Sequence, residues 1–158
     1  METAKVLSFL IKPLEENTGR GRALTITPAL SGVPLDQIVK QFELEYHYEP
    51  SGGYAGIVPR FFNYGPLEEY FMGQPATDYF RENGGLYLLG CQCGEVGCWP
   101  LTGRIKAEEK RMVWSDFRQP HRSVRDYSDF GPFVFDLEQY HTAVKTMAVE
   151  YSTSPSSA

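Results

Sequence analysis

The feature that most constrains the fold is a pair of strand-like segments, residues 86–93 and 98–105, on either side of the short turn Gly94–Gly97. Two apolar segments around a glycine-bracketed turn are typical of a β-hairpin. A polar turn at 107–110 leads into a third such segment, residues 111–117. The sequence therefore predicts a three-stranded antiparallel meander over about residues 86–117.

Strands and loops are also predicted outside this meander. Residues 5–14 and 24–27 are rich in β-branched and apolar side chains, so they predict two strands that pair as a hairpin across residues 15–22. Residues 44–48 predict another strand. The segment 118–132 contains Pro120, Gly131 and Pro132, which favours an irregular loop.

Two helices are indicated by apolar residues at helical spacing. The first begins at Pro34, and the second at Asp136, which has Gln139 three residues later as in a capped helix start. A helical turn is also expected over residues 66–71. The residues expected to face the core are Leu35, Ile38, Val39 and Phe42 in the first helix, and Leu137, Tyr140, Val144 and Met147 in the second.

The length of 158 residues fits one domain. We predict an α+β fold over residues 1–151, with an antiparallel sheet centred on the meander and helices, including a C-terminal one, packed on one face. Residues 152–158 are rich in serine and predict a disordered tail. No apolar run is long enough for a membrane-spanning helix, so we expect a cytoplasmic protein.

The three cysteines fall within eight residues, which argues against a secreted disulfide framework. Alternation along a strand places Cys91 and Cys93 on one side, and a symmetric turn would set Cys98 opposite Cys93. This side also carries Thr102 and Arg104, away from the main hydrophobic layer. Three converging thiolates and one imidazole suit a zinc ion. The candidate fourth ligands are His121, which we favour because its loop leaves the third strand near the hairpin tip, and His47 and His141.

Two other uses of the cysteines remain open at this point. Free cysteines often fill space as small apolar side chains on a partly buried face. They can also take part in redox chemistry or act as nucleophiles.

A basic and aromatic segment follows the meander. The chain carries a net charge of −5, which disfavours general nucleic-acid binding, but residues 104–125 hold seven basic and three acidic residues. Arginine forks suit phosphate or carboxylate groups. We predict a binding surface for a protein or a small anionic ligand, formed by Trp114, Arg118, His121, Arg122 and Arg125.

The same segment admits two other interpretations. His121 beside Asp116 or Asp126 could form an acid–base pair. Alternatively, arginine–aspartate pairs could hold the loop against its own domain. The sequence carries no phosphate-binding glycine loop, nucleophile elbow or dinucleotide fingerprint.

The segments 90–101, 113–122 and 126–136 together resemble a family of small bacterial proteins with a CxCGxxGCWPL hairpin and a WSDFxQPHR loop. The resemblance implies a shared fold and no particular activity. We therefore predict a non-enzymatic binding or interaction module that uses the arginine- and aromatic-rich pole. The alternative is a metal-assisted hydrolase or transferase that uses His121 and a nearby aspartate, with zinc on the cysteines.

Overall fold

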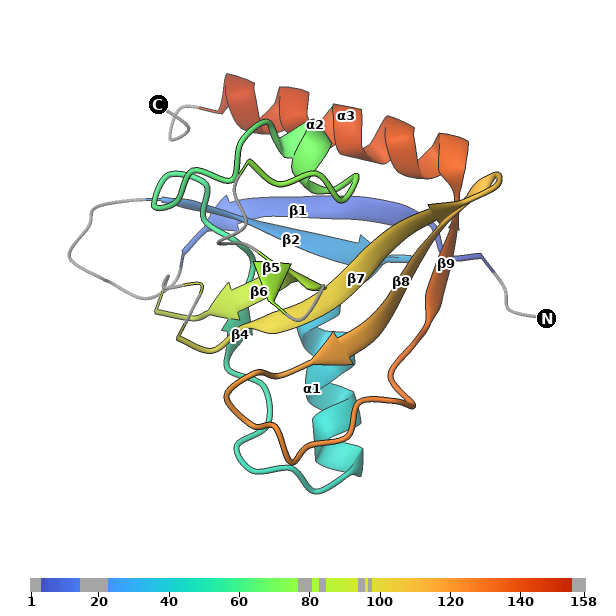
Figure 1. Ribbon diagram of the computed structural model, residues 1–158. Coiled ribbons are helices and arrows are strands. Elements are labelled where there is room, and N and C mark those ends of the chain that lie inside the picture. Colours follow the sequence, from blue (N-terminus) through green and yellow to red (C-terminus); the bar gives the residue numbers. More distant parts are fainter. Residues whose placement is uncertain are drawn as a thin grey trace.

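The computed structural model describes residues 4–14, 23–76, 81–82, 85–93, 96 and 98–154. These residues form the predicted α+β fold, with the strands divided between two antiparallel sheets (Figure 1). The smaller sheet has the order β1-β2-β3 and confirms the predicted hairpin between the first two strands. Its strands are β1 (Leu7–Pro13), β2 (Leu24–Leu30) and β3 (Val33–Pro34).

The larger sheet contains the predicted meander as β6, β7 and β8. Its order is β4-β6-β7-β8-β9, and β5 pairs with β6. The strands are β4 (Tyr54–Ala55), β5 (Arg81–Glu82), β6 (Gly85–Cys91), β7 (Leu101–Glu108), β8 (Arg111–Arg118) and β9 (Phe133–Asp136). The strand β9 was not predicted; it pairs with β8 in the register Trp114–Phe133 and Met112–Phe135.

Three helices are present among the described residues: α1 (Leu35–Glu45), α2 (Leu67–Tyr70) and α3 (Leu137–Thr153). The predicted start of α3 is confirmed, since the Asp136 side chain accepts a hydrogen bond of 3.0 Å from the Gln139 backbone N–H. The buried residues of α3 are Tyr140, Val144, Met147 and Tyr151. None of the described helices is long and apolar enough to cross a membrane.

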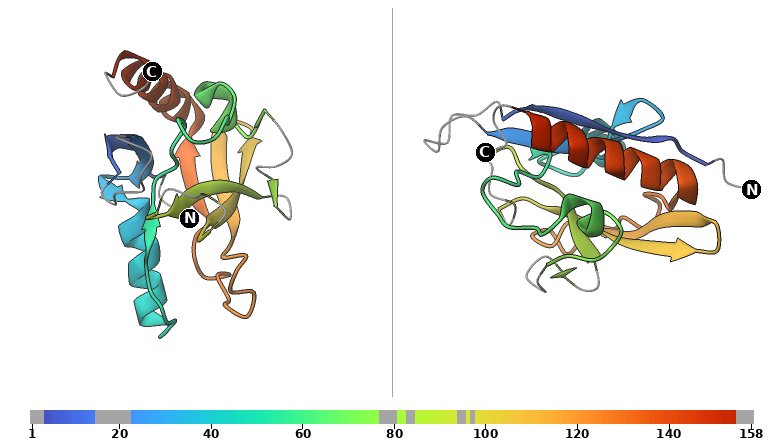
Figure 2. Two further views of the ribbon diagram at one scale, coloured as in Figure 1. Left: turned by 90° about the vertical axis from the view of Figure 1, so that its left-hand side faces the viewer. Right: turned by 90° about the horizontal axis from the view of Figure 1, so that it is seen from above.

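The two sheets enclose the core, and α3 lies across one end of both (Figure 2). This helix packs on β1 of the smaller sheet and on β8 and β9 of the larger one, whereas α1 packs on β2 and β3. An antiparallel bridge joins Ile26 to Ile57 between the sheets. A Cβ atom on Gly56 would lie 2.3 Å from the Ile26 carbonyl oxygen, so the close approach of these segments requires glycine.

Three predicted boundaries are wrong. The expected strand at 44–48 is the end of α1, which continues to Glu45 because Phe42 and Glu43 are buried on its inner side. His47 then adopts φ +59°, which ends the helix. The expected disordered tail from residue 152 begins too early, since α3 runs to Thr153; residues 155–158 lie outside the described residues, as do 15–22.

The third correction concerns the hairpin. β6 ends at Cys91 and β7 begins at Leu101, with Leu89 opposite Leu101, so the connection is longer than a symmetric four-residue turn. Gly94, Glu95 and Gly97 lie outside the described residues. The side expected to face away from the core is also covered, because Leu89, Tyr87 and Thr102 are buried. β2 contacts β6, and the Tyr70 hydroxyl donates to the Tyr87 carbonyl.

Candidate functional site

Residues 118–132, called here the arginine loop, fold against α1 at the lower end of the molecule in Figure 1. The Phe42 ring of α1 stacks on Tyr127 at 5.5 Å and contacts Phe130 edge-on at 5.2 Å. The Tyr46 hydroxyl donates a hydrogen bond of 2.7 Å to Asp129. Aromatic packing and polar contacts together therefore fix the loop on the helix.

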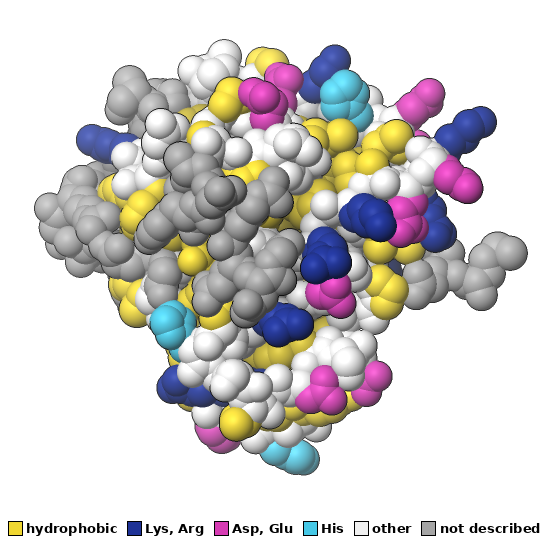
Figure 3. Space-filling view, in the orientation of Figure 1, with side chains coloured by type: hydrophobic (Ala, Val, Ile, Leu, Met, Phe, Trp, Pro, Cys, Tyr) yellow, Lys and Arg dark blue, Asp and Glu magenta, His cyan; other side chains and the backbone are white. Residues whose placement is uncertain are grey.

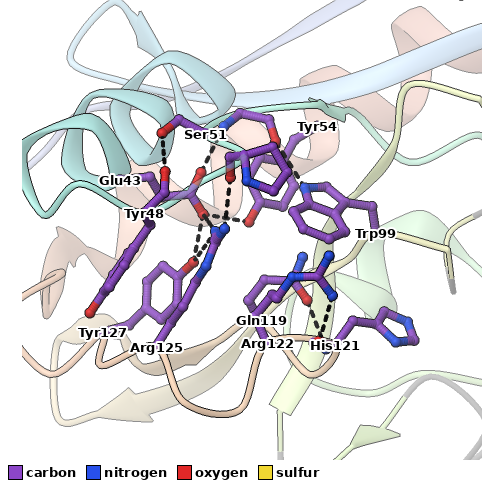
Figure 4. A network of polar contacts seen from close by, with 12 residues as sticks. Glu43, Tyr48, Ser51, Tyr54, Trp99, Gln119, His121, Arg122, Arg125 and Tyr127 are labelled. Atoms are coloured by element: carbon purple, nitrogen blue, oxygen red, sulfur yellow. Dashed lines mark hydrogen bonds and ion pairs between the residues drawn. The ribbon is translucent and has the colours of Figure 1, made fainter.

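A buried ion pair lies beneath this aromatic layer. Arg125 Nη1 is 3.1 Å from Glu43 Oε2, and the two side chains are only 4% and 0% exposed. Glu43 Oε2 also accepts hydrogen bonds from the hydroxyls of Tyr54, at 2.7 Å, and Tyr127, at 2.5 Å. Glu43 Oε1 accepts from the backbone N–H of Gly52 at 2.8 Å. The carboxylate is thus satisfied on both oxygens (Figure 4).

The other end of the Arg125 guanidinium ties a second loop to the site. Its Nη2 donates to the Pro50 carbonyl at 2.8 Å, and its Cζ lies 5.2 Å from the Tyr48 ring centroid and 5.7 Å from that of Trp99. Burial raises the pKa of Tyr127 to about 12, and burial likewise raises the pKa of Tyr54. Both phenols stay protonated at neutral pH, so they donate to Glu43.

A basic pocket of about 450 Å³ opens between the end of β8 and the arginine loop, lined by residues 115–120, 122–123, 125–128, 130 and 132. Gln119 is 2% exposed within this lining. Its Oε1 accepts a hydrogen bond of 2.8 Å from the His121 backbone N–H, which fixes the orientation of the amide. Its Nε2 is buried and has no hydrogen-bond partner among the described residues.

The predicted arginines Arg118, Arg122 and Arg125 all line this pocket. Arg118 is exposed, and its side chain forms no hydrogen bond or ion pair with another described residue. Arg122 lies with its Cζ 4.8 Å from the Trp99 ring centroid, and its Nη1 donates to the His121 carbonyl. The charge of Arg125 is committed to Glu43. Two arginines therefore remain to meet a ligand at the pocket.

Both predicted aspartates line the pocket and already have partners. Asp116 lies 3.7 Å from Arg104 Nε in an exposed ion pair. Hydrogen bonds from the side chain and backbone of Ser128 hold the pKa of Asp126 below its usual value. Figure 3 shows basic and acidic side chains interspersed over β7 and β8, so this face is of mixed charge rather than uniformly positive.

Two predicted binding residues lie elsewhere. Trp114 is 0% exposed, and its Nε1 donates to the Tyr140 hydroxyl at 3.0 Å, so it is a core residue. The described residues that line the basic pocket do not include His121, whose exposed ring extends from the turn beside Gln119 (Figure 4). The tryptophan beside the pocket is instead Trp99, whose Nε1 donates to the Gly52 carbonyl at 2.8 Å.

The structure brings the three cysteines together. The sulfur atoms of Cys91, Cys93 and Cys98 all lie within 4.8 Å of one another, which confirms the predicted convergence. This cysteine cluster could bind a metal ion. His121 does not belong to the group, and neither does any other described histidine or carboxylate. Cys91 and Cys93 are half-buried, and Cys98 is exposed.

Sequence reasoning missed Glu43, Tyr54, Tyr127, Trp99 and Gln119 as parts of this region. One signal was available for Glu43, which follows the buried Val39 by four residues and so lies on the apolar face of α1. A charged residue on a buried face needs a buried partner. Nothing in the sequence pattern identified Arg125, 82 residues later, as that partner.

Comparison of the chain with protein family models, with curated proteins and with solved structures finds no match.

Proposed function

We propose that the protein is a non-enzymatic binding module that accepts an anionic group, a phosphate or a carboxylate, in the basic pocket. The observation that carries the proposal is the pair Arg118 and Arg122, which line the pocket and form no ion pair with a described carboxylate. Gln119 also belongs to the lining, and its buried Nε2 has no hydrogen-bond partner among the described residues. An unsatisfied buried donor costs about 1–3 kcal/mol. A bound oxyanion would supply the acceptor after a side-chain movement that uncovers this buried nitrogen.

The two arginines at the pocket add charge to this donor. Arg118 and Arg122 can each present several N–H groups in a plane, which matches the oxygens of a carboxylate or phosphate. The Trp99 ring under Arg122 limits the positions of that guanidinium. Arg122 would therefore lose little freedom on binding.

The arginine loop is held in place by contacts with the buried Glu43 of α1. Arg125 and Tyr127 belong to the arginine loop, and both contact the buried Glu43 of α1. This arrangement separates the roles of the arginines: Arg125 shapes the pocket, while Arg118 and Arg122 supply its free charge. The pocket volume of about 450 Å³ lies within the ordinary range for small-molecule sites and also suits one anionic side chain of a partner protein.

The alternative function is a metal-assisted hydrolase or transferase that uses His121, Asp116 or Asp126 with zinc on the cysteines. Its support is the convergence of the three thiols. The aspartates favour it less, because Asp116 pairs with Arg104 and Asp126 accepts hydrogen bonds from Ser128. A cytoplasmic location, where thiols stay reduced, would suit either function.

The proposal is tested by isothermal titration calorimetry of the whole chain with inorganic phosphate and with citrate. A hydrogen bond to a charged group contributes about 1.5–3 kcal/mol. Arg118→Ala and Arg122→Ala should each weaken binding at least about tenfold, since tenfold corresponds to about 1.4 kcal/mol. Arg111→Ala is the matched control, because Arg111 is exposed and pairs with Glu108 at the β7–β8 turn.

Three outcomes decide the matter. Weakened binding in the two pocket variants with an unchanged Arg111→Ala control supports the proposal. Equal losses in all three variants would mean that only the overall charge attracts the anion. No heat of binding from either anion with the wild-type protein would contradict the proposal.

A further inference from the structure

We propose that Cys91, Cys93 and Cys98 form a three-thiolate site for a zinc ion whose fourth coordination position is filled by no described residue of the chain and is open to an outside ligand. The sulfur atoms already lie within 4.8 Å of one another. A zinc–sulfur bond of about 2.3 Å in tetrahedral geometry puts sulfurs about 3.8 Å apart. Side-chain rotations that move each sulfur atom by at most about 1 Å would bring the three sulfurs to this spacing.

The fold gathers the sulfurs through contacts on both sides of Cys91. β4 holds this residue from one side, with Tyr54 opposite Cys91 and the Gln92 N–H bonded to the Gly53 carbonyl at 3.1 Å. On the other side the connection folds back onto β6 at Val96, which is 2% exposed. A Cβ atom on Gly90 would lie 3.1 Å from Val96 Cα, so this close return favours glycine.

One contact inside the cluster favours a metal-bound thiolate. The Cys93 backbone N–H donates to Cys91 Sγ at 3.4 Å. Hydrogen bonds to ligating sulfur orient the ligand and tune the metal. Zinc would replace the protons of the three thiols, and those protons would pass to solvent.

The three sulfur ligands favour a soft metal ion such as zinc, and they leave one of its coordination positions unfilled. No histidine or carboxylate among the described residues joins the three sulfurs, so hard cations such as magnesium or calcium lack their preferred oxygen ligands. Zinc in proteins is almost always four-coordinate. Three protein ligands plus one exchangeable position are typical of zinc sites that bind water or a substrate group.

A pocket beside the cysteine cluster leaves room for a ligand at the fourth coordination position. A pocket of about 300 Å³ is lined by the three cysteines, residues 50–53, Gln92 and Trp99. An outside ligand could therefore approach the sulfurs from solvent. Trp99 follows Cys98 directly and lines the same pocket. The proposal stands independently of anion binding, since Arg118 and Gln119 do not line this pocket.

The test starts from the whole chain purified under reducing conditions, stripped of metal with a chelator and titrated with Co²⁺ as a spectroscopic stand-in for Zn²⁺. We expect one equivalent bound per chain, with thiolate-to-cobalt charge-transfer and tetrahedral ligand-field bands, followed by displacement by Zn²⁺. Cys93→Ser and Cys98→Ser should each weaken zinc binding at least about tenfold, the smallest loss usual even for an outer-shell partner. His121→Ala should bind zinc as the wild type does.

Cys98 is exposed, so its substitution should leave the apo fold intact, and near-ultraviolet circular dichroism of each apo variant checks this. Folded wild-type protein that binds no Co²⁺ or Zn²⁺ would overturn the proposal. Equal zinc affinity in the cysteine variants and the wild type would overturn it as well, because the ion would then be adventitious. A loss in His121→Ala as large as that in Cys98→Ser would overturn the open fourth position.

Discussion

The substitution Glu43→Gln removes the negative charge at the centre of the buried network while keeping the size of the side chain. Oε1 faces the Gly52 N–H, and Oε2 faces three donors, from Tyr54, Tyr127 and Arg125. A glutamine amide would therefore direct its NH₂ at a donor in either orientation. It would also leave the Arg125 guanidinium, which is 4% exposed, without its counter-charge.

The expected cost follows from these two losses. Removing one partner of a buried ion pair costs about 3–5 kcal/mol, because the remaining charge stays buried and uncompensated. For a domain of this size each kcal/mol lowers Tm by about 2–4 °C. We therefore expect Glu43→Gln to lower the free energy of unfolding by about 3–5 kcal/mol and Tm by about 6–20 °C.

The assay is urea denaturation followed by circular dichroism, with Tm from the same signal on heating. The matched control is Glu45→Gln, an exposed glutamate two residues further along α1, which should change stability by less than about 0.5 kcal/mol. A double-mutant cycle with Arg125→Gln isolates the pair itself. A cost below about 1 kcal/mol for Glu43→Gln would refute the claim that this pair holds the arginine loop on α1.

Three further predictions concern stability. Gly56→Ala should cost at least about 1–3 kcal/mol in urea denaturation, because its Cβ would lie 2.3 Å from the Ile26 carbonyl; an unchanged midpoint would contradict the close joining of the sheets. Asp136→Ala should cost about 1 kcal/mol through loss of the α3 cap, and Asp136→Ser should restore most of it. The raised pKa of Tyr127 favours its neutral form in the fold, so its contribution to stability is complete below pH 10 and is lost as the pH rises through about 12. Tyr127→Phe should flatten this alkaline decline, and an identical decline in both proteins would count against it.

The elements that sequence reasoning predicted correctly carry their signals locally. The spacing of Leu35, Val39 and Phe42 predicts α1, and Asp136 with Gln139 predicts the start of α3. Turn residues and alternating apolar residues likewise predict the meander. Each signal spans a few neighbouring residues, which is the range over which propensity and capping act.

The candidate site depends instead on contacts between distant segments. Glu43 and Arg125 are 82 residues apart, and each has the residue type of an exposed surface position. The roles of Trp114 and Trp99 were equally hard to predict. Trp114 belongs to the core, whereas Trp99 lines the cysteine pocket and contacts Arg122 of the basic pocket. Which tryptophan is buried depends on β9 and α3 covering β8, and no local pattern states this.

The convergence of the cysteines was predicted correctly, although through a hairpin that is more regular than the real one. Cys91 ends β6, whereas Cys93 and Cys98 lie beyond the paired residues. The sulfurs meet because the connection folds back at Val96, a contact that strand alternation does not describe. The three cysteines are close in sequence, so their clustering could be predicted. The spacing of their sulfur atoms depends on how the chain folds back onto β6 at Val96.

The most direct measurement of the proposed function is the nuclear magnetic resonance signal of the Gln119 side-chain amide in ¹⁵N-labelled protein titrated with inorganic phosphate. Gln119 lines the basic pocket, so its amide N–H groups, although buried, report on an anion bound there. We predict that its two N–H resonances shift in a saturable way, together with the Arg118 and Arg122 side-chain signals, and that Arg118→Ala weakens this response. Gln119 resonances that stay unchanged while exposed lysines elsewhere shift would contradict the account.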